Sequence, residues 1–344
     1  MVILATSVQS AALCSVFTVF ISTYRLHTTV TPRGECDNCC EIRESVDIKF
    51  FLYNQKYQKN GKQIFLNDAK GLKNLNKTMP LAIFVHGFTD SSIGPSTLSA
   101  MKVKDAFMEI KNYSVILVDW SPIAAFPWYL DAVNNAPRVS RYISRFIKFL
   151  VKSGVLLENM HLIGFSLGAE IAGFVGKTLK DWGILLPRLT GIDPAGPMFM
   201  NGDTSTHISR SDAKFVDIIH TDGGILGMPW AVGHADFFPN GGFASQPGCI
   251  NESLSRNNLI GIVGEFDFYF YQVNFCILYY MIKLQFPLNF SWLCMFSSHI
   301  EREWLNISTN TVLKIQFALN YKTSSSPQTF EDMTHDKFKI HKLN

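Results

Sequence analysis

The chain has 344 residues, 47% of them hydrophobic and 17% charged, with a formal net charge of +3. This length and apolar content can bury one large core or two modest ones. So small a net charge, without a long basic run, argues against a nucleic-acid-binding protein, and the dinucleotide, phosphate-loop and His-Glu-x-x-His signatures are missing. The sequence therefore predicts no cofactor and no nucleic-acid partner.

Residues 1–30 are predicted to be a signal peptide or a membrane anchor, because residues 2 to about 21 are largely apolar. No basic residue precedes the apolar stretch, no clear small-x-small cleavage site follows it, and the first positive charge is Arg25. A cleaved signal is favoured over an anchor because the residues that follow have extracellular features. We therefore expect a secreted, extracellular protein.

Seven cysteines favour an oxidising compartment, and loss of Cys14 with the signal would leave six. After Cys36-Asp-Asn-Cys39-Cys40 no second Cys or His pair follows at zinc spacing, so disulfides are predicted there rather than a metal site. Five sequences of the N-glycosylation type also fit secretion: Asn76, Asn112, Asn251, Asn289 and Asn306.

Short apolar runs alternate with helical patterns along the chain. The expected strands are residues 48–53, 64–66, 81–85, 115–118, 160–163, 189–192 and 216–219. The expected helices are residues 97–111, 134–152 and 167–180. Continuous apolar strands separated by helices indicate a mostly parallel sheet that is buried on both faces, which is the α/β class.

Residues 264–296 break this pattern and are rich in Phe, Tyr, Ile, Leu and Asn. Polar residues interrupt the apolar stretch at Gln272, Asn274 and Lys283, which makes it a poor transmembrane helix. We interpret it as an anomalous insert in a domain that spans residues 45–320. Residues 321–344 form a polar tail that is expected to be disordered.

The most informative motif is Gly164-Phe-Ser166-Leu-Gly168, which lies between an apolar run and a helix-forming sequence. A strand, tight turn and helix of this kind set the serine at the apex of a strained turn, where the two glycines avoid crowding. The motif predicts that Ser166 is a nucleophile that attacks a carbonyl carbon.

A serine hydroxyl needs a base to take its proton and a carboxylate to orient that base. Asp193 ends an expected strand and precedes Pro-Ala-Gly, so it belongs on the loop where such a carboxylate is needed; Asp222 is its competitor. Periodicity cannot choose among three candidates for the base, His220, His234 and His299. With His299, the latest, the order Ser, Asp, His matches the α/β-hydrolase arrangement.

The tetrahedral oxyanion needs backbone N–H donors, each worth about 3–4 kcal/mol in comparable hydrolases. The amide of Leu167, at the positive end of the helix after Ser166, is one expected donor of this oxyanion hole. The second is expected from Phe88, in the loop after the 81–85 strand, where Gly87 lets the backbone approach closely.

Seven motifs occur together in one order along the chain. They are residues 86–90 (His-Gly-Phe-Thr-Asp), 118–121 (Val-Asp-Trp-Ser), 164–169, 191–195 (Gly-Ile-Asp-Pro-Ala), 215–223, 233–242 and 246–249 (Gln-Pro-Gly-Cys). Together they resemble the secreted pancreatic-lipase family of animals, including its insect neutral lipases and phospholipases A1. The resemblance covers residues 45–263 and then 297–305. It implies an α/β-hydrolase fold with helices on both faces of the sheet, and Ser166, Asp193 and His299 as the triad.

Pancreatic members of that family have a carboxyl-terminal β-sandwich that meets colipase. Only 45 residues follow His299, so neither a β-sandwich nor a colipase partner is expected. Those members also hold calcium with acidic residues ahead of a Ser-Asp-Ala segment. Here Asp212 remains, but Thr204, His207 and Ser209 precede it at the matching places, so no metal is expected.

Two other departures lie near the catalytic motifs. The family usually reads Gly-His-Ser-Leu-Gly-Ala-His around the nucleophile, whereas this chain has Phe165 and Glu170. Glu170, one helical turn past Ser166, is expected to alter the local field. The family also closes a short lid with a cysteine two residues before the catalytic histidine, but that position is Ser297 here.

Because Ser297 replaces that cysteine, the expected pairing of the remaining cysteines changes. Cys249 is expected to pair with Cys276 or Cys294, or to stay unpaired. The 264–296 insert beside them is interpreted in two ways: as a very hydrophobic lid that docks on lipid, or, with slightly more weight, as sequence foreign to the functional protein.

The resemblance implies a secreted hydrolase of lipid carboxylic esters that acts at a membrane or lipid-droplet surface. In the family a short loop before His-Ala-Asp-Phe accompanies phospholipase activity, and only residues 223–233 separate Asp222 from His234. This favours the phospholipid sn-1 ester, whereas the long apolar lid region favours triacylglycerol. The alternative is a catalytically impaired lipid-binding or yolk-like storage protein, which the presence of all three triad residues disfavours.

Overall fold

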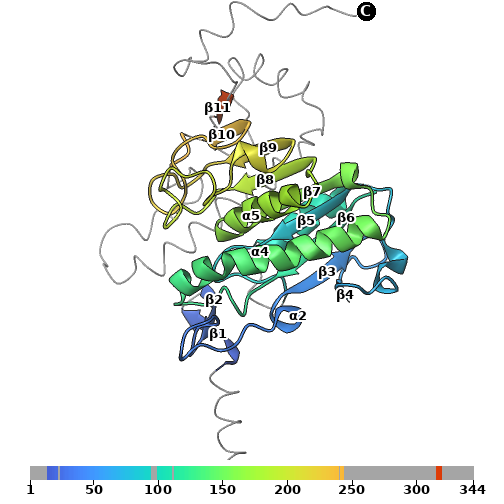
Figure 1. Cartoon of the computed structure of the whole chain (residues 1–344), viewed down its shortest axis with the longest axis horizontal. Helices are drawn as coiled ribbons and strands as arrows, with labels where there is room; N and C mark the ends of the chain where they lie inside the picture. Colours follow the sequence, from blue (N-terminus) through green and yellow to red (C-terminus); the bar gives the residue numbers. More distant parts are fainter. Residues whose placement is uncertain are drawn as a thin grey trace, which may run out of the picture.

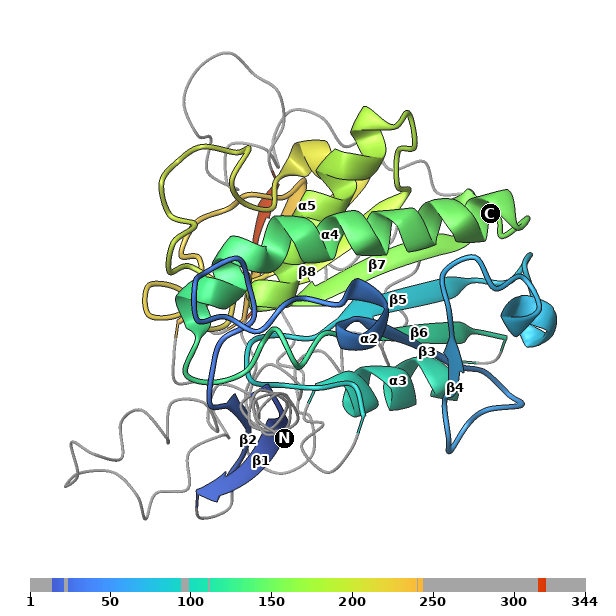
Figure 2. The same cartoon turned by 60° about the horizontal axis from the view of Figure 1, so that its bottom comes forward.

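The computed structural model describes residues 14–21, 24–93, 99–110, 112–239, 241–243 and 315–319. A twisted sheet runs through the middle of these residues, with helices on its two faces (Figures 1 and 2). Within them the sheet has nine strands in the order β11-β10-β9-β8-β7-β5-β6-β3-β4. Their bounds are β3 Lys49–Tyr53, β4 Lys62–Ile64, β5 Leu81–Val85, β6 Ser114–Asp119, β7 Met160–Phe165, β8 Arg188–Ile192, β9 Phe215–Ile219, β10 Ala235–Pro239 and β11 Ile315–Leu319.

The six inner strands, from β6 to β10, pair in parallel. Antiparallel strands close both edges: β3 and β4 lie beyond β6, and β11 lies beyond β10. Strand β5 lies between β6 and β7, so the direction of the crossovers reverses there. Open sheets of this kind bind ligands at the carboxyl ends of the strands near such a reversal. The structure confirms the α/β-hydrolase fold.

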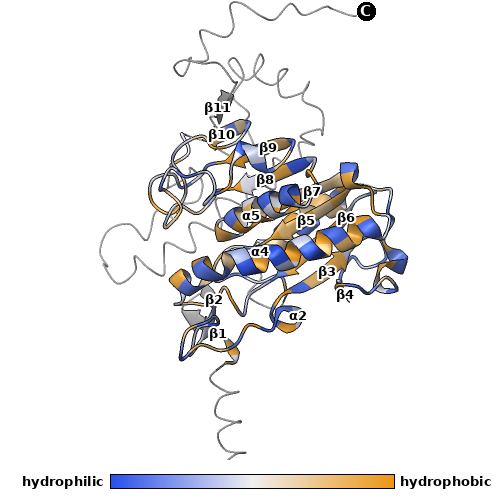
Figure 3. Ribbon diagram, in the orientation of Figure 1, coloured by the Kyte–Doolittle hydropathy of each residue, from blue (hydrophilic) through white to orange (hydrophobic). Residues whose placement is uncertain are grey.

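Three long helices cover the sheet: α3 (Ala100–Glu109) lies on one face, and α4 (Tyr129–Lys152) and α5 (Leu167–Asp181) lie on the other (Figure 2). Successive side chains of one strand point to opposite faces of the sheet. In β5, Ile83 and Val85 pack with the α4 and α5 side, whereas Ala82 and Phe84 pack with the α3 side. Strand β5 is therefore hydrophobic along its length, while α4 mixes hydrophobic and hydrophilic residues (Figure 3). The short helices are α2 (Glu44–Asp47), η1 (Gly71–Asn74), η2 (Leu157–Asn159) and η3 (Arg210–Asp212).

The predicted inner strands all form, but two elements differ from the sequence reading. Helix α4 begins at Tyr129 rather than near residue 134, and Pro137 lies inside it. A proline usually occupies the first turn of a helix because it lacks an N–H. Here buried Ala132 and Ala136 pack on the core and offset the lost hydrogen bond. Strand β10 was not predicted.

The amino-terminal region has structure within the predicted signal segment of residues 1–30. Residues 16–29 form a hairpin of β1 (Val16–Ile21) and β2 (Tyr24–Thr29), and β1 is rich in the β-branched and aromatic residues that favour strands. Cys14 is bonded to Cys40, so it is not set apart from the other cysteines as predicted. Cys36 and Cys39 form a second disulfide, which confirms disulfides in this cluster. Residues 1–13 lie outside the described residues, and signal cleavage stays a prediction.

None of the helices in the described part of the chain is both long and apolar enough to span a bilayer. The predicted glycosylation sites Asn76 and Asn112 are exposed. Several predictions fall outside the described residues: the 264–296 insert, the 321–344 tail, His299, Ser297, Cys249, Cys276, Cys294 and the other three glycosylation sites.

Candidate active site

Ser166 lies where the chain turns sharply from β7 into α5. Its backbone angles, φ +52° and ψ −123°, are unusual for a residue other than glycine. Its N–H donates to the carbonyl oxygen of Ile192 at 2.9 Å, and its own carbonyl oxygen accepts from Ala169 at 2.9 Å. Backbone hydrogen bonds from the neighbouring strand β8 and within α5 thus hold Ser166 at the apex of the predicted turn.

The two glycines of the motif are required by close backbone contacts. A Cβ on Gly164 would lie 2.2 Å from the carbonyl oxygen of Gly168. A Cβ on Gly168 would lie 2.3 Å from the carbonyl oxygens of both Val85 and His86. Because the obstructing atoms are backbone, they cannot move aside as a side chain would.

Gly168→Ala is expected to lower both stability and activity, because β5 or α5 must shift to admit the methyl group. Overpacking of this kind costs about 1–3 kcal/mol or more. Gly183→Ala is the control: no atom of the described residues lies within 4 Å of its added Cβ, although its φ is +76°. Thermal unfolding of the two variants should show the larger loss for Gly168→Ala; equal losses would contradict this account.

The loop after β5, which carries the predicted oxyanion donor Phe88, passes close to Ser166. A Cβ on Gly87 would lie 3.1 Å from the Cβ of Ser166, so this loop passes directly over the serine. Phe88 follows Gly87 in the loop. Leu167 is the first residue of α5, where backbone N–H groups have no partner within the helix. The two predicted donors therefore flank Ser166, and their role in oxyanion binding stays a prediction.

His86 and Trp120 fix this loop, a role that the sequence reading missed. The backbone N–H of Trp120 donates to His86 Nε2 at 3.1 Å, and the indole N–H donates to the His86 carbonyl oxygen at 2.9 Å. His86 Nδ1 donates in turn to the carbonyl oxygen of Gly87 at 2.8 Å, and the ring is fully buried. The signal was present in the sequence, because Trp120 belongs to the Val-Asp-Trp-Ser motif.

Asp193 is fully buried at the carboxyl end of β8, next to the strand that leads to Ser166. Its Oδ1 accepts the backbone N–H groups of Thr221 and Asp222, each at 2.9 Å. Its Oδ2 is buried and has no hydrogen-bond partner among the described residues. A carboxylate held by one oxygen, with the other oxygen open, is suited to accept an imidazole N–H.

Two buried carboxyl groups lie together here, which explains the competition seen in the sequence. Burial raises the pKa of Asp193, against the hydrogen bonds from Thr221 and Asp222, which lower it. Burial, and then the negative charge of Asp193, raise the pKa of Asp222 to about 7. Because Asp193 accepts two N–H bonds through one oxygen, we assign it the ionised form, whereas Asp222 is partly protonated near neutral pH.

Two of the three candidate bases are engaged elsewhere. His220 is fully buried, with Nδ1 2.8 Å from the carbonyl oxygen of Met228 and Nε2 2.8 Å from Asp236 Oδ1. His234 Nδ1 accepts the backbone N–H of Val216 at 3.0 Å, near the start of β9 and so at the edge of the sheet opposite Asp193. His299 lies outside the described residues, and its role as the base stays a prediction.

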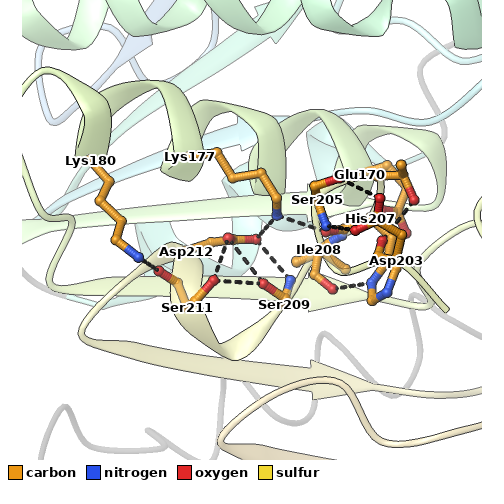
Figure 4. Close-up of polar contacts among 11 residues, drawn as sticks. Glu170, Lys177, Lys180, Asp203, Ser205, His207, Ile208, Ser209, Ser211 and Asp212 are labelled. Carbon is orange, nitrogen blue, oxygen red and sulfur yellow. Dashed lines mark hydrogen bonds and ion pairs between the residues drawn. The ribbon is translucent and has the colours of Figure 1, made fainter.

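The segment that holds calcium in the family is built differently here. Lys177, on α5, places its ammonium 2.6 Å from Asp212 Oδ2 and 2.7 Å from the carbonyl oxygen of His207 (Figure 4). A cationic side chain therefore already binds the one acidic residue that remains. These residues do not fit a calcium ion.

Comparison with known proteins agrees with this geometry. Residues 25–274 match the family model described as Lipase. Lipase member H from Xenopus tropicalis is 34% identical over 208 residues, which cover 60% of this chain and 44% of that protein. Phospholipase A1 from Vespa velutina is 36% identical over 245 residues, which cover 66% of this chain and 78% of that protein.

A solved structure, Est1E from Butyrivibrio proteoclasticus, is 13% identical at a TM-score of 0.28, covering 52% of this chain and 51% of its own. The chain spans less than half the length of Lipase member H. Because the family model covers most of the chain, the chain belongs to the lipase family.

Proposed function

We propose that this protein hydrolyses carboxylic esters of lipids, with Ser166 as nucleophile, His299 as base and Asp193 as the acid that orients the base. The observation that carries the proposal is that the carboxyl ends of β7 and β8 lie side by side. One presents a serine in a strained turn, and the other presents a buried carboxylate with one open oxygen.

The chemistry follows from these positions. The imidazole takes the proton of the Ser166 hydroxyl as its oxygen attacks the ester carbonyl, and the amides of Leu167 and Phe88 stabilise the oxyanion. The imidazolium then protonates the leaving alcohol oxygen as its bond to the acyl carbon breaks, which leaves the acyl-enzyme. Water, deprotonated by the same imidazole, releases the fatty acid and restores the serine.

Exposed apolar side chains support a lipid substrate. All but Leu130, which lies in the first turn of α4, are on loops that follow the carboxyl ends of β6, β8, β9 and β10, the edge at which Ser166 lies. They are Phe126, Leu130, Met198, Met200, Ile225, Trp230 and Phe243. Such side chains, gathered at the mouth of a site, favour contact with a membrane or lipid-droplet surface.

We propose a phospholipid as the preferred substrate. The loop between Asp222 and His234 is short and folds down onto the β8 end: Gly227 N–H donates to the Asp222 carbonyl at 3.0 Å, and Met228 N–H donates to the Pro194 carbonyl at 2.9 Å. A loop tied down in this way leaves room for a charged head group. One of the relatives, from Vespa velutina, is named phospholipase A1.

Fatty-acid release from phosphatidylcholine and from triolein, measured side by side on the full chain, tests this preference. We expect faster release from phosphatidylcholine, and from its sn-1 position. Faster release from triolein would assign the protein to the triacylglycerol lipases instead.

We also propose that the protein is secreted. The disulfides Cys14–Cys40 and Cys36–Cys39 support this, since such bonds persist in oxidising compartments. Expression in an animal cell line, followed by assay of the medium and of the cell fraction, tests the proposal.

A further inference from the structure

Helix α5, which begins directly after Ser166, is held by one face to the segment of residues 203–212. A Cβ on Gly173 would lie 2.7 Å from Ile208 Cα, and one on Gly176 would lie 2.4 Å from the carbonyl oxygen of Asp212. Lys180 on the same face donates to the carbonyl oxygen of Ser211 at 3.2 Å (Figure 4). Any change in this contact is therefore transmitted to the helix that carries the nucleophile at its start.

Glu170 makes the contact nearest to Ser166. It lies in the first turn of α5, fully buried, and its Oε2 accepts the backbone N–H of Ile208 at 2.7 Å. Its Oε1 is buried and has no hydrogen-bond partner among the described residues. An ionised carboxylate would leave charge on a buried oxygen without a donor, which costs far more than burying a neutral acid.

The charged groups around Glu170 do not compensate such a charge. Lys177 on α5 is a cation that acts on Glu170, but its ammonium is bound to Asp212 of η3. Tyr129 of α4 faces Glu170, and its hydroxyl donates to the carbonyl oxygen of Pro197 at 3.0 Å. His207 donates from Nδ1 to the carbonyl oxygen of Ile208 at 2.7 Å, and Asp203 is exposed. An ionised Glu170 would thus give the buried cluster an uncompensated negative charge.

We propose that Glu170 is a positioning residue for the hydrolysis proposed above, and that it acts as an uncharged carboxylic acid. It holds Ile208 on the first turn of α5 while it keeps negative charge away from the Leu167 amide that receives the oxyanion. Residues 166 and 170 are one helical turn apart, roughly 6 Å along the axis. A negative charge at that distance opposes the charge that develops in the transition state.

The pH dependence of activity tests this role. Burial raises the pKa of Glu170 to about 8, against the Ile208 hydrogen bond and Lys177, which lower it. Glu170 therefore loses its proton as the pH rises through that value. We expect kcat for a soluble ester, p-nitrophenyl butyrate, to fall about tenfold from pH 7.5 to 9.5 in the wild-type chain.

Glu170→Gln keeps an oxygen for the Ile208 N–H but cannot ionise, so its ratio of kcat at pH 9.5 to kcat at pH 7.5 should stay near one. If the glutamine variant does not fold, the same ratio is measured for Glu170→His, which restores the residue usual in the family. An equal alkaline fall in wild type and variant would overturn the proposal, because the fall would then belong to another group. A wild-type profile without the fall would overturn it as well.

The role of Glu170 rests on the proposed function. Thermal unfolding tests the protonation of Glu170 separately, because it does not require the protein to hydrolyse an ester. A carboxyl group with a folded-state pKa above its unfolded value loses its stabilising contribution as the pH rises between the two values. The melting temperature of Glu170→Gln minus that of wild type should therefore increase from pH 5 to pH 8. This result does not depend on whether the protein hydrolyses any ester. A constant difference would show that Glu170 is ionised throughout and would overturn the proposal even in an active enzyme.

Discussion

Ser166→Ala is expected to lower turnover by at least on the order of 10⁴-fold without unfolding the chain. The hydroxyl oxygen is the protein atom that forms the bond to the acyl carbon in the proposed mechanism. The turn itself is held by backbone groups, including the Ser166 N–H to the Ile192 carbonyl, and these remain in the variant. Initial rates on phosphatidylcholine, with circular dichroism as the check on folding, measure the effect.

A serine-directed phosphonate provides the control for this experiment. It should label wild type at Ser166 and leave the alanine variant unlabelled. Substantial residual hydrolysis by Ser166→Ala would reject the serine as nucleophile. A folded wild-type chain that takes no label would instead favour the lipid-binding or storage protein considered above.

Asp193→Asn is expected to cost about 10⁴-fold in kcat, as the loss of an orienting carboxylate does in comparable triads. The asparagine oxygen can still accept the N–H groups of Thr221 and Asp222, so the amide nitrogen takes the place of Oδ2. It then presents a donor to the imidazole where an acceptor is needed, and the ring is held in the wrong tautomer. Single-turnover acylation by p-nitrophenyl butyrate would report the loss directly.

Asp222→Asn is the matched control, because Asp222 is the neighbouring buried carboxyl group and competes with Asp193 in the sequence. With its pKa raised to about 7, it carries only part of a negative charge near neutral pH, and the substitution removes that part. We expect kcat within about tenfold of wild type, since the change removes no acceptor needed by the base. If Asp222→Asn caused the larger loss and Asp193→Asn the smaller, the orienting role would belong to Asp222.

Much of the fold was readable from the sequence because buried parallel strands have a local signature. Residues 81–85 and 160–163 are continuous apolar runs, as strands covered on both faces must be, and they form β5 and β7. The hairpin of β1 and β2 was not readable, because a short apolar segment near an amino terminus also has the composition of a signal peptide. The early start of α4 was hidden by Pro137, whose cost only tertiary packing offsets.

By itself the sequence determined the elements of the site whose geometry is local. Gly164, Ser166 and Gly168 define the strained turn, and Asp193 follows its strand with a turn-forming Pro-Ala-Gly. Only the tertiary structure decided what depends on residues far apart in the chain. It showed that His220 is bound to Asp236, that Trp120 holds the loop over Ser166, and that one oxygen of Asp193 has no hydrogen-bond partner in the described part of the chain. The reason is physical: hydrogen bonds and burial between distant segments leave no periodic signal in the sequence, whereas a tight turn must be encoded by the residues that form it.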